Sequence, residues 1–130
     1  MKIIRFDKIK YIPASHENPK DPGVLKKILA NKKDLLTGQL QMINWAKLLP
    51  NKTFVSHYHQ DMQEIFIILS GQAKFIIDEE EKTVKRGDVI IVPIKKLHSM
   101  KNKTNKEIEY IVMGIATNKG GKTVIESNRQ

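Results

Sequence analysis

The sequence predicts an all-β fold, an antiparallel sandwich or barrel, and three observations support this prediction. Short apolar segments recur along the chain, turn-forming residues separate them, and apolar and polar side chains alternate most clearly in the second half. Alternation with a period of two residues buries one face of a strand, and regularly spaced short strands are typical of sandwiches and barrels. A chain of 130 residues has room for one such core.

The N-terminal segment is predicted to be an extended arm followed by an edge strand. Pro13 and Pro19 each bias the preceding residue away from helix, so the arm is expected to be extended. Residues 21–30 also fit a short helix in which Asp21 would cap the first turn. Gly23 and the short length of the segment argue against the helix, and we therefore favour the edge strand.

The rest of the chain is predicted to be a series of short strands. Residues 65–69 and 73–77 flank a Ser-Gly turn, and this pattern predicts a hairpin. Further turns are predicted at residues 78–80, 86–88 and 118–121. The remaining predicted strands are residues 39–48, 53–59, 83–85, 89–92, 108–116 and 123–125.

The composition excludes several classes of protein and site. Cysteine is absent, so disulfides are excluded and any metal must be held by nitrogen and oxygen. The net charge is +9, but Arg5, Arg86 and Arg129 are the only arginines and the lysines are scattered, which argues against nucleic-acid binding. No apolar run approaches the roughly 20 residues of a membrane span, and the first residues do not resemble a signal peptide. We expect a cytoplasmic protein that binds neither nucleic acid nor membrane.

Three histidines and one glutamate stand at spacings that predict a metal site. His57 and His59 are two residues apart, so in a strand both side chains leave the same face, while Tyr58 leaves the other. Glu64 opens the next predicted strand, and an antiparallel neighbour would bring its carboxylate beside the two histidines. His98 lies about four strands farther along and can join the site only if the sheet closes on itself. Nitrogen and oxygen ligands of this kind suit Mn, Fe, Ni, Cu or Zn.

These residues resemble the two motifs of the cupin family. Residues 51–71 resemble the first motif, G-(x)5-H-x-H-(x)3-4-E-(x)6-G, and residues 87–102 resemble the second, G-(x)5-P-x-G-(x)2-H-(x)3-N. The matching residues are His57, His59, Glu64 and Gly71 in the first motif and Gly87, Pro93, His98 and Asn102 in the second. Asn51 and Lys95 stand where the motifs have glycine. Asparagine tolerates a left-handed backbone, whereas lysine in that conformation costs about 1 kcal/mol.

The resemblance implies a small single-domain cupin, similar to the mannose-6-phosphate-isomerase-like group, with a double-stranded β-helix or jelly-roll barrel. It implies one divalent transition-metal ion on His57, His59, Glu64 and His98, a pocket that opens at one end of the barrel, and a homodimer. The predicted parts are an N-terminal arm and edge strand at residues 1–34, the cupin barrel at 35–117, and a C-terminal strand and tail at 118–130. Asn102 is expected to satisfy backbone groups.

The metal site is compatible with three functions. The first is an enzyme that uses the metal as a Lewis acid, such as a sugar or sugar-phosphate isomerase or epimerase, and such an enzyme also needs a general base. The second is a dioxygenase, in which the substrate and dioxygen meet on the metal. The third is a non-catalytic module that binds or senses a small anionic metabolite. Because Glu64 is taken up as a ligand, the sequence identifies no catalytic residue.

The remaining histidine and aromatic residues have simpler interpretations. His16 is predicted to hold a loop in place rather than to serve as a fifth ligand. Trp45, Tyr58 and Tyr110 are most simply explained by packing on the sheet, although any of them could line the mouth of a pocket.

Overall fold

The structure is a computed structural model, and it describes residues 1–116 and 122–126. Among these residues a single short helix precedes a series of strands, which confirms the all-β prediction. The elements in chain order are η1 (Phe6–Lys8), β1 (Ile12–Pro13), β2 (Val24–Asn31), β3 (Leu40–Leu48), β4 (His57–His59), β5 (Met62–Ile68), β6 (Gln72–Ile77), β7 (Glu80–Lys85), β8 (Val89–Val92), β9 (His98–Lys101), β10 (Ile108–Ala116) and β11 (Thr123–Ile125).

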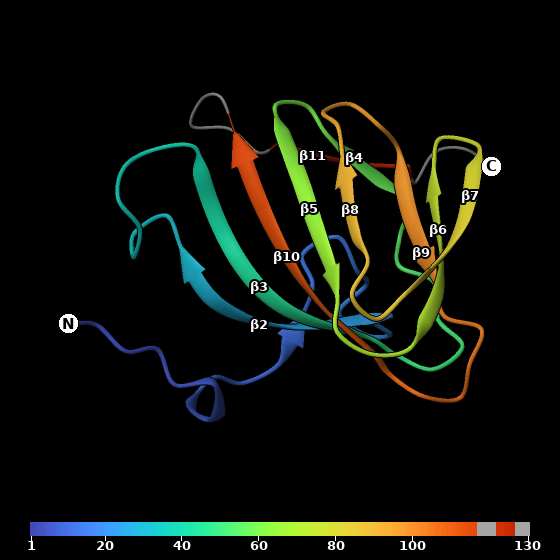
Figure 1. Ribbon diagram of the computed structural model, residues 1–130, viewed down its shortest axis with the longest axis horizontal. Coiled ribbons are helices and arrows are strands. Elements are labelled where there is room, and N and C mark those ends of the chain that lie inside the picture. The colour runs from blue at the N-terminus through green and yellow to red at the C-terminus, as the bar shows by residue number, and fades with distance from the viewer. Residues whose placement is uncertain (117–121, 127–130) are drawn as a thin grey trace.

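The strands form two antiparallel sheets that face each other, as expected of a jelly roll (Figure 1). One sheet has six strands in the order β1-β2-β3-β10-β5-β8, and the other has five in the order β11-β4-β9-β6-β7. Strands far apart in sequence are therefore neighbours, as where β10 runs between β3 and β5. The described residues contain no helix that is both long and apolar enough to cross a membrane.

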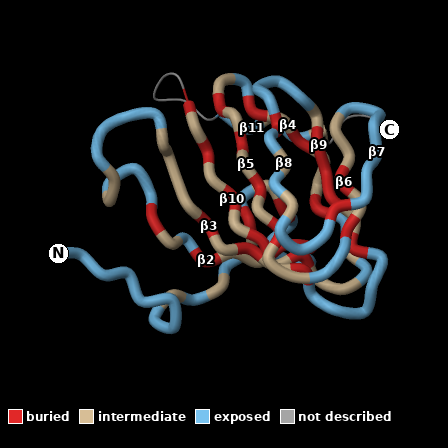
Figure 2. The backbone as a smooth tube through the Cα atoms, in the orientation of Figure 1, coloured by how far each residue is buried: buried red, intermediate tan, exposed pale blue. Residues whose placement is uncertain are grey.

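The core lies between the sheets, and alternation of buried and half-buried residues is most regular along β5 and β10 (Figure 2). Buried residues in β10 alternate with half-buried ones along its whole length. Phe66 of β5 and Phe75 of β6 contact each other from opposite sheets, with ring centroids 5.1 Å apart. Burying each such side chain contributes roughly 1.5–3 kcal/mol, so this contact helps to hold the two layers together.

The predicted hairpin of residues 65–69 and 73–77 is wrong. The two segments belong to β5 and β6, which lie in different sheets. Gly71 between them has a φ of +82°, and a Cβ at this position would lie 3.0 Å from Ile108 Cγ1. The turn therefore carries the chain from one layer to the other, close against the core. The hairpin of this region is instead β6 with β7, closed by the two residues after Ile77, of which Asp78 has a φ of 52°.

The ambiguous segment near the N-terminus is a strand, so the helix alternative is wrong. It forms β2, which pairs with β3 along most of its length and with β1 only at Leu25 and Lys26. The first part of the arm, which contains η1, packs on the outer side of these strands. Phe6 lies edge-on against Trp45, with ring centroids 4.9 Å apart, and Lys27 Nζ lies 3.7 Å from the centre of the Phe6 ring. These contacts confirm that Trp45 packs on the sheet.

One other predicted strand is shorter in the structure, and one predicted turn lies outside the described residues. The strand predicted at residues 53–59 is shorter, because only His57–His59 forms β4 and Thr53 makes a single bridge to Lys101. The turn predicted at residues 118–121 lies outside the described residues.

Candidate metal centre

Three strands from both sheets bring the four predicted ligands together. His57 and His59 share the buried face of β4, and the half-buried Tyr58 lies between them in the chain. His98 of β9 pairs directly with His57 within the five-stranded sheet. His98 therefore joins the site as expected, through the pairing of β4 with β9 in one of two sheets rather than through closure of a single sheet. Glu64 comes from β5 in the opposite sheet, and the expectation that β5 would be the antiparallel neighbour of β4 is wrong. The group therefore lies between the two layers rather than on one of them.

The four side chains are buried and close enough to share one ion. Glu64 Oε1 lies 2.8 Å from His59 Nε2 and 3.0 Å from His98 Nε2. One potential ligand atom of each residue, His57 included, lies within 4.8 Å of the others. Ligand atoms at about 2.1 Å from a common ion are separated by about 3.0–4.2 Å, depending on their angle at the ion. The spacing of the group is thus close to that of a metal site.

A second set of contacts orients the imidazole rings. His57 Nδ1 donates to the Val55 carbonyl at 2.6 Å, and His98 Nδ1 donates to the Lys96 carbonyl at 3.0 Å. Because a carbonyl oxygen only accepts hydrogen bonds, Nδ1 carries a proton in both rings, and Nε2 is the nitrogen that faces the rest of the group. His59 Nδ1 lies 3.0 Å from the hydroxyl of Thr123, which pairs with His59 from β11.

The electrostatics favour the protonation states that metals bind. Burial, together with the neighbouring His16 and His98, lowers the pKa of His57 to about 3. Burial by itself would raise the pKa of Glu64, but hydrogen bonds from His59 and His98 and their charges hold it below its ordinary value. A neutral imidazole at His57 and an ionised carboxylate at Glu64 are electron-pair donors that a divalent cation can satisfy. The residues present therefore fit a transition-metal ion.

The family of the chain is shown by comparison with known proteins. The model of the cupin domain matches residues 44–114, which is more than half of the chain and includes all four residues of the group. The chain belongs to the cupin family. An uncharacterized protein of Methanocaldococcus jannaschii is 31% identical over 114 residues, covering 85% of each chain. The oxalate-binding protein of Thermotoga maritima is 26% identical over 81 residues, covering 62% of this cupin and 67% of that protein.

Solved structures share the fold of this cupin at low sequence identity. The crystal structure of a predicted oxalate decarboxylase from Thermotoga maritima has a TM-score of 0.77 and 24% identity, covering 88% of this chain and 99% of that one. A sugar phosphate isomerase of the cupin superfamily from Silicibacter pomeroyi has a TM-score of 0.74 and 18% identity, covering 98% and 94% of the two chains. At this level of identity the likeness concerns the fold alone.

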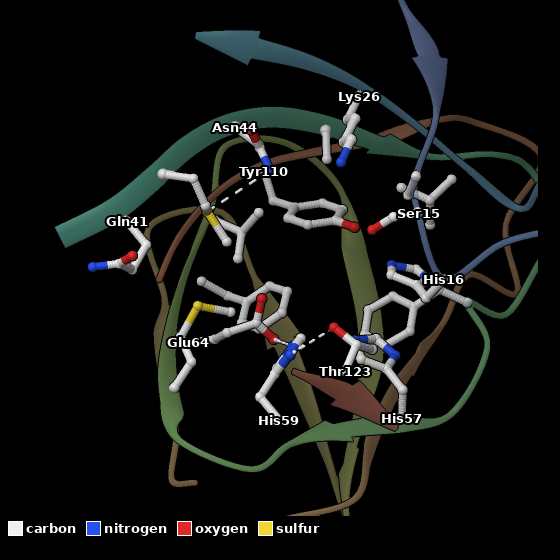
Figure 3. Close-up of a pocket in the computed structure, with 18 of the residues that line it drawn as sticks. Ser15, His16, Lys26, Gln41, Asn44, His57, His59, Glu64, Tyr110 and Thr123 are labelled. Carbon is white, nitrogen blue, oxygen red and sulfur yellow. Dashed lines mark hydrogen bonds and ion pairs between the residues drawn. The ribbon is translucent and has the colours of Figure 1, made fainter. Parts of the chain in front are cut away.

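A cavity of ≈ 310 Å³ opens beside the four residues (Figure 3). His57, His59 and Glu64 line one side of it, whereas His98 lies behind them and is only 1% exposed. The opposite side carries Lys26 and Tyr110. The rest of the inner wall is mainly apolar and includes Val24, Met42, Ala46, Phe54, Met62, Phe66 and Val112.

The N-terminal arm supplies a further histidine to this cavity, and a buried glutamate beside it holds the arm in place; the sequence did not indicate either role. His16 lines the cavity and stacks on His57, with ring centroids 4.2 Å apart. Its Nδ1 lies 2.8 Å from Glu17 Oε2. Glu17 is buried and also accepts hydrogen bonds from the backbone N–H groups of Gly23 and Val55, both at 2.7 Å. A Cβ at Gly23 would lie 2.9 Å from Glu17 Oε1, so the missing side chain permits this close approach.

The two positions that replace motif glycines adopt left-handed backbone conformations without displacing the site. Asn51 has a φ of 57° and Lys95 a φ of 63°. The Lys95 N–H donates to the His59 carbonyl at 2.7 Å, which fixes the loop before His98 to β4. Lys95 is absent from the described lining of the cavity, so its side chain leaves the pocket unchanged. The side-chain amide of Asn102 donates to the carbonyls of Leu48, Leu49 and Lys106, which confirms its predicted role.

Proposed function

We propose that this cupin holds one divalent transition-metal ion, drawn from Mn, Fe, Ni, Cu or Zn, and is an enzyme acting on a small oxygen-rich or anionic metabolite. The ligands would be the Nε2 atoms of His57, His59 and His98 and the carboxylate of Glu64. The observation that carries this proposal is the meeting of four buried donors, from opposite sheets, at one side of a cavity of ≈ 310 Å³. Sites of this kind, concave and apolar with a few convergent polar groups, are typical of small-molecule pockets.

A bound divalent ion would act as a Lewis acid on an oxygen of the metabolite. The chain itself supplies the shape of the cavity and a candidate acid–base group in addition to the metal ligands. Phe54 and Phe66 form apolar wall beside the ligand group and limit the access of water to that side. His16 is the one histidine of the sequence outside the ligand group, and it lines the same cavity. Its contact with Glu17 would support a role in proton transfer, because a carboxylate bound to one ring nitrogen fixes the orientation of the ring and leaves the other nitrogen to exchange a proton.

The His16–Glu17 pair favours an isomerase or epimerase over a dioxygenase, since the former reactions require proton transfer. The fold of the sugar phosphate isomerase from Silicibacter pomeroyi is consistent with this preference. The sequence alone identified no general acid or base, and His16 would fill that role in the cavity. A dioxygenase would need less from the protein and would leave the His16–Glu17 pair without a chemical role.

A second candidate function is non-catalytic binding of a small anion. The relative from Thermotoga maritima that is named an oxalate-binding protein favours this candidate. The same four ligands and the same cavity would serve it, with the metal as an anchor for the ligand's oxygens.

The experiment that separates these functions uses metal-loaded protein and three readouts. Exchange of substrate hydrogens with deuterated water, followed by NMR on a panel of sugars and sugar phosphates, detects isomerase or epimerase chemistry. Oxygen uptake by Fe(II)-loaded protein on small diketones and catechols detects a dioxygenase, and calorimetry detects binding alone. For an isomerase, His16→Asn should abolish exchange but retain the metal. Lys20→Ala, at an exposed position of the same arm outside the described lining of the cavity, should retain both. Binding without exchange or oxygen uptake would establish the binding module and overturn the enzyme proposal.

A further inference from the structure

One lysine of this cupin points into the barrel instead of toward solvent. Lys26 lies on β2 two residues after the buried Val24, so the two side chains share the inner face of the strand. Across the sheet Lys26 pairs with Ala46 of β3, and Ala46 pairs in turn with Tyr110 of β10. The small side chain of Ala46 leaves room between its two long neighbours. The polar ends of Lys26 and Tyr110 consequently lie on the same side of the cavity, as Figure 3 shows.

This ammonium group has no carboxylate partner within the described part of the chain. Other lysines do, and their ion pairs lie at the surface: Lys2–Asp34, Lys47–Glu107, Lys52–Asp21, Lys96–Asp78 and Lys101–Glu81. Burial lowers the pKa of Lys26, and the charge of Glu64 acts in the opposite direction. Glu64 is itself engaged by His59 and His98. A half-buried cation without a partner costs stability, which is typical of a group kept for binding.

The neighbours of Lys26 on the inner wall define what it can bind. Tyr110 is 2% exposed, and burial together with the charges of Glu64 and Glu17 raises its pKa, so the phenol keeps its proton and can donate it in a hydrogen bond. Around these two groups the wall carries apolar residues such as Val24 and Val112, and Ser15 and Asn44 lie beside Tyr110. An ammonium and a phenol match an anionic oxygen, because both can donate to it and one carries the opposite charge.

We propose that Lys26, assisted by Tyr110, is the specificity-determining residue of the pocket and binds a carboxylate or phosphate group at the end of the metabolite opposite the metal centre. The inference rests on the proposed function and narrows its substrate class: the ligand is bifunctional, with oxygen donors at the His57, His59, Glu64 and His98 group and a second, anionic end at Lys26. A neutral ligand would leave the ammonium desolvated and unpaired, and the pocket would select against it.

Paired probes that differ only in the distal group test this assignment. Calorimetry with metal-loaded protein compares succinate with butyrate, and phosphoglycolate with glycolate, so that each pair contrasts an anionic end with a neutral one. The two pairs also distinguish carboxylate from phosphate as the preferred anion. Lys26→Met should weaken binding of the preferred probe with an anionic distal end, succinate or phosphoglycolate, about 10- to 100-fold, as expected for a hydrogen bond to a charged group. The same variant should change the affinity for the neutral-ended member of that pair, butyrate or glycolate, by less than about twofold, since only the distal contact is lost.

Lys33→Met is the control for the loss of one surface charge, because Lys33 is exposed and lies outside the described lining of the cavity, and it should leave the affinity for every probe within about twofold. Both variants should keep the metal content of the parent. The exposed-lysine variant should also keep the thermal stability of the parent, and Lys26→Met should equal or exceed it, because the unpaired cation is removed. Any loss of affinity is then not a loss of folding. If Lys26→Met binds the anionic-ended probes as tightly as the parent does, or loses the same affinity for both members of a pair, the role of Lys26 is overturned while the proposed function stays intact. If the metal-loaded parent binds none of the four probes but turns over or binds neutral sugars, the anionic subsite is wrong. A parent that takes up no metal would remove the proposed function and this inference together.

Discussion

Replacing Glu17 by glutamine tests how the N-terminal arm is fixed to the barrel. The buried carboxylate accepts three hydrogen bonds: Oε1 from the Gly23 N–H, and Oε2 from the Val55 N–H and His16 Nδ1. A glutamine side chain has nearly the same shape but only one oxygen. Whichever atom becomes the NH2 group then faces a backbone N–H, so a buried donor loses its acceptor.

The magnitude follows from these three contacts. A buried donor without an acceptor costs about 1–3 kcal/mol, and a hydrogen bond to a charged group is about 1 kcal/mol stronger than one to a neutral group. Glu17→Gln should therefore lower the free energy of unfolding by about 2–4 kcal/mol, a large part of the 5–15 kcal/mol typical of a domain.

Urea unfolding of the metal-free protein, followed by fluorescence of the one tryptophan, measures this loss. The matched control is Asp21→Asn, which breaks a single ion pair between Asp21 and Lys52 in the same segment. Because the Asp21 side chain is 74% exposed, its loss should change stability by less than about 0.5 kcal/mol. A Glu17→Gln loss no larger than that of the control would refute the anchoring role of Glu17.

The same carboxylate should make stability depend on pH. Burial alone would raise the pKa of Glu17, but the hydrogen bonds from His16, Val55 and Gly23 outweigh it and lower the pKa from its ordinary value of 4.5. A lowered pKa in the folded state means that the stabilisation is fully present above pH 4.5 and disappears as the pH falls through the lower, folded-state value. Between neutral pH and acid, the parent should consequently lose more stability than Glu17→Gln. Parallel stability curves for the two proteins would contradict this assignment.

Two further predictions concern backbone conformation. Gly71→Ala and Gly87→Ala both place a side chain at positive φ, at a cost of about 1–2 kcal/mol each, but only the former meets the buried Ile108. Gly71→Ala should therefore destabilise the protein more in urea unfolding, and equal losses would argue against the close contact at this turn. Lys95→Gly relieves a left-handed lysine and should raise the free energy of unfolding by up to about 1 kcal/mol, with a smaller gain for Asn51→Gly. A loss of stability in Lys95→Gly would show that the lysine side chain contributes more than its strain costs.

Local patterns in the sequence predicted the strands and the shared face of two ligands. Alternation of apolar residues predicts which segments are strands, and the spacing of His57 and His59 places both on one face whatever the partners of β4 are. The length of chain between Glu64 and His98 shows that His98 must come from a distant strand. These features depend only on period-two geometry, which each segment carries by itself.

The pairing of strands depends on contacts that no single segment encodes. β5 and β6 are consecutive and joined by a Ser-Gly turn, yet they lie in opposite sheets because the left-handed Gly71 packs against Ile108 of a strand far along the chain. Thr123 reaches His59 only because β11 pairs with β4, 64 residues away. Nothing in the sequence distinguishes Lys26 from the other scattered lysines. The register of β2 places it opposite Ala46 on the inner face.

The metal content of the purified protein tests the central claim most directly. Elemental analysis of protein prepared without chelators, or reconstituted with Mn(II), Fe(II), Ni(II), Cu(II) or Zn(II), should find about one transition-metal ion per folded chain. The double variant His57→Ala, His59→Ala should lose that ion, and His16→Ala, which removes the stacked but non-ligating imidazole, should keep it. A folded parent that takes up no metal, or a double variant that binds it as well as the parent, would contradict the assignment of these four residues as a metal centre.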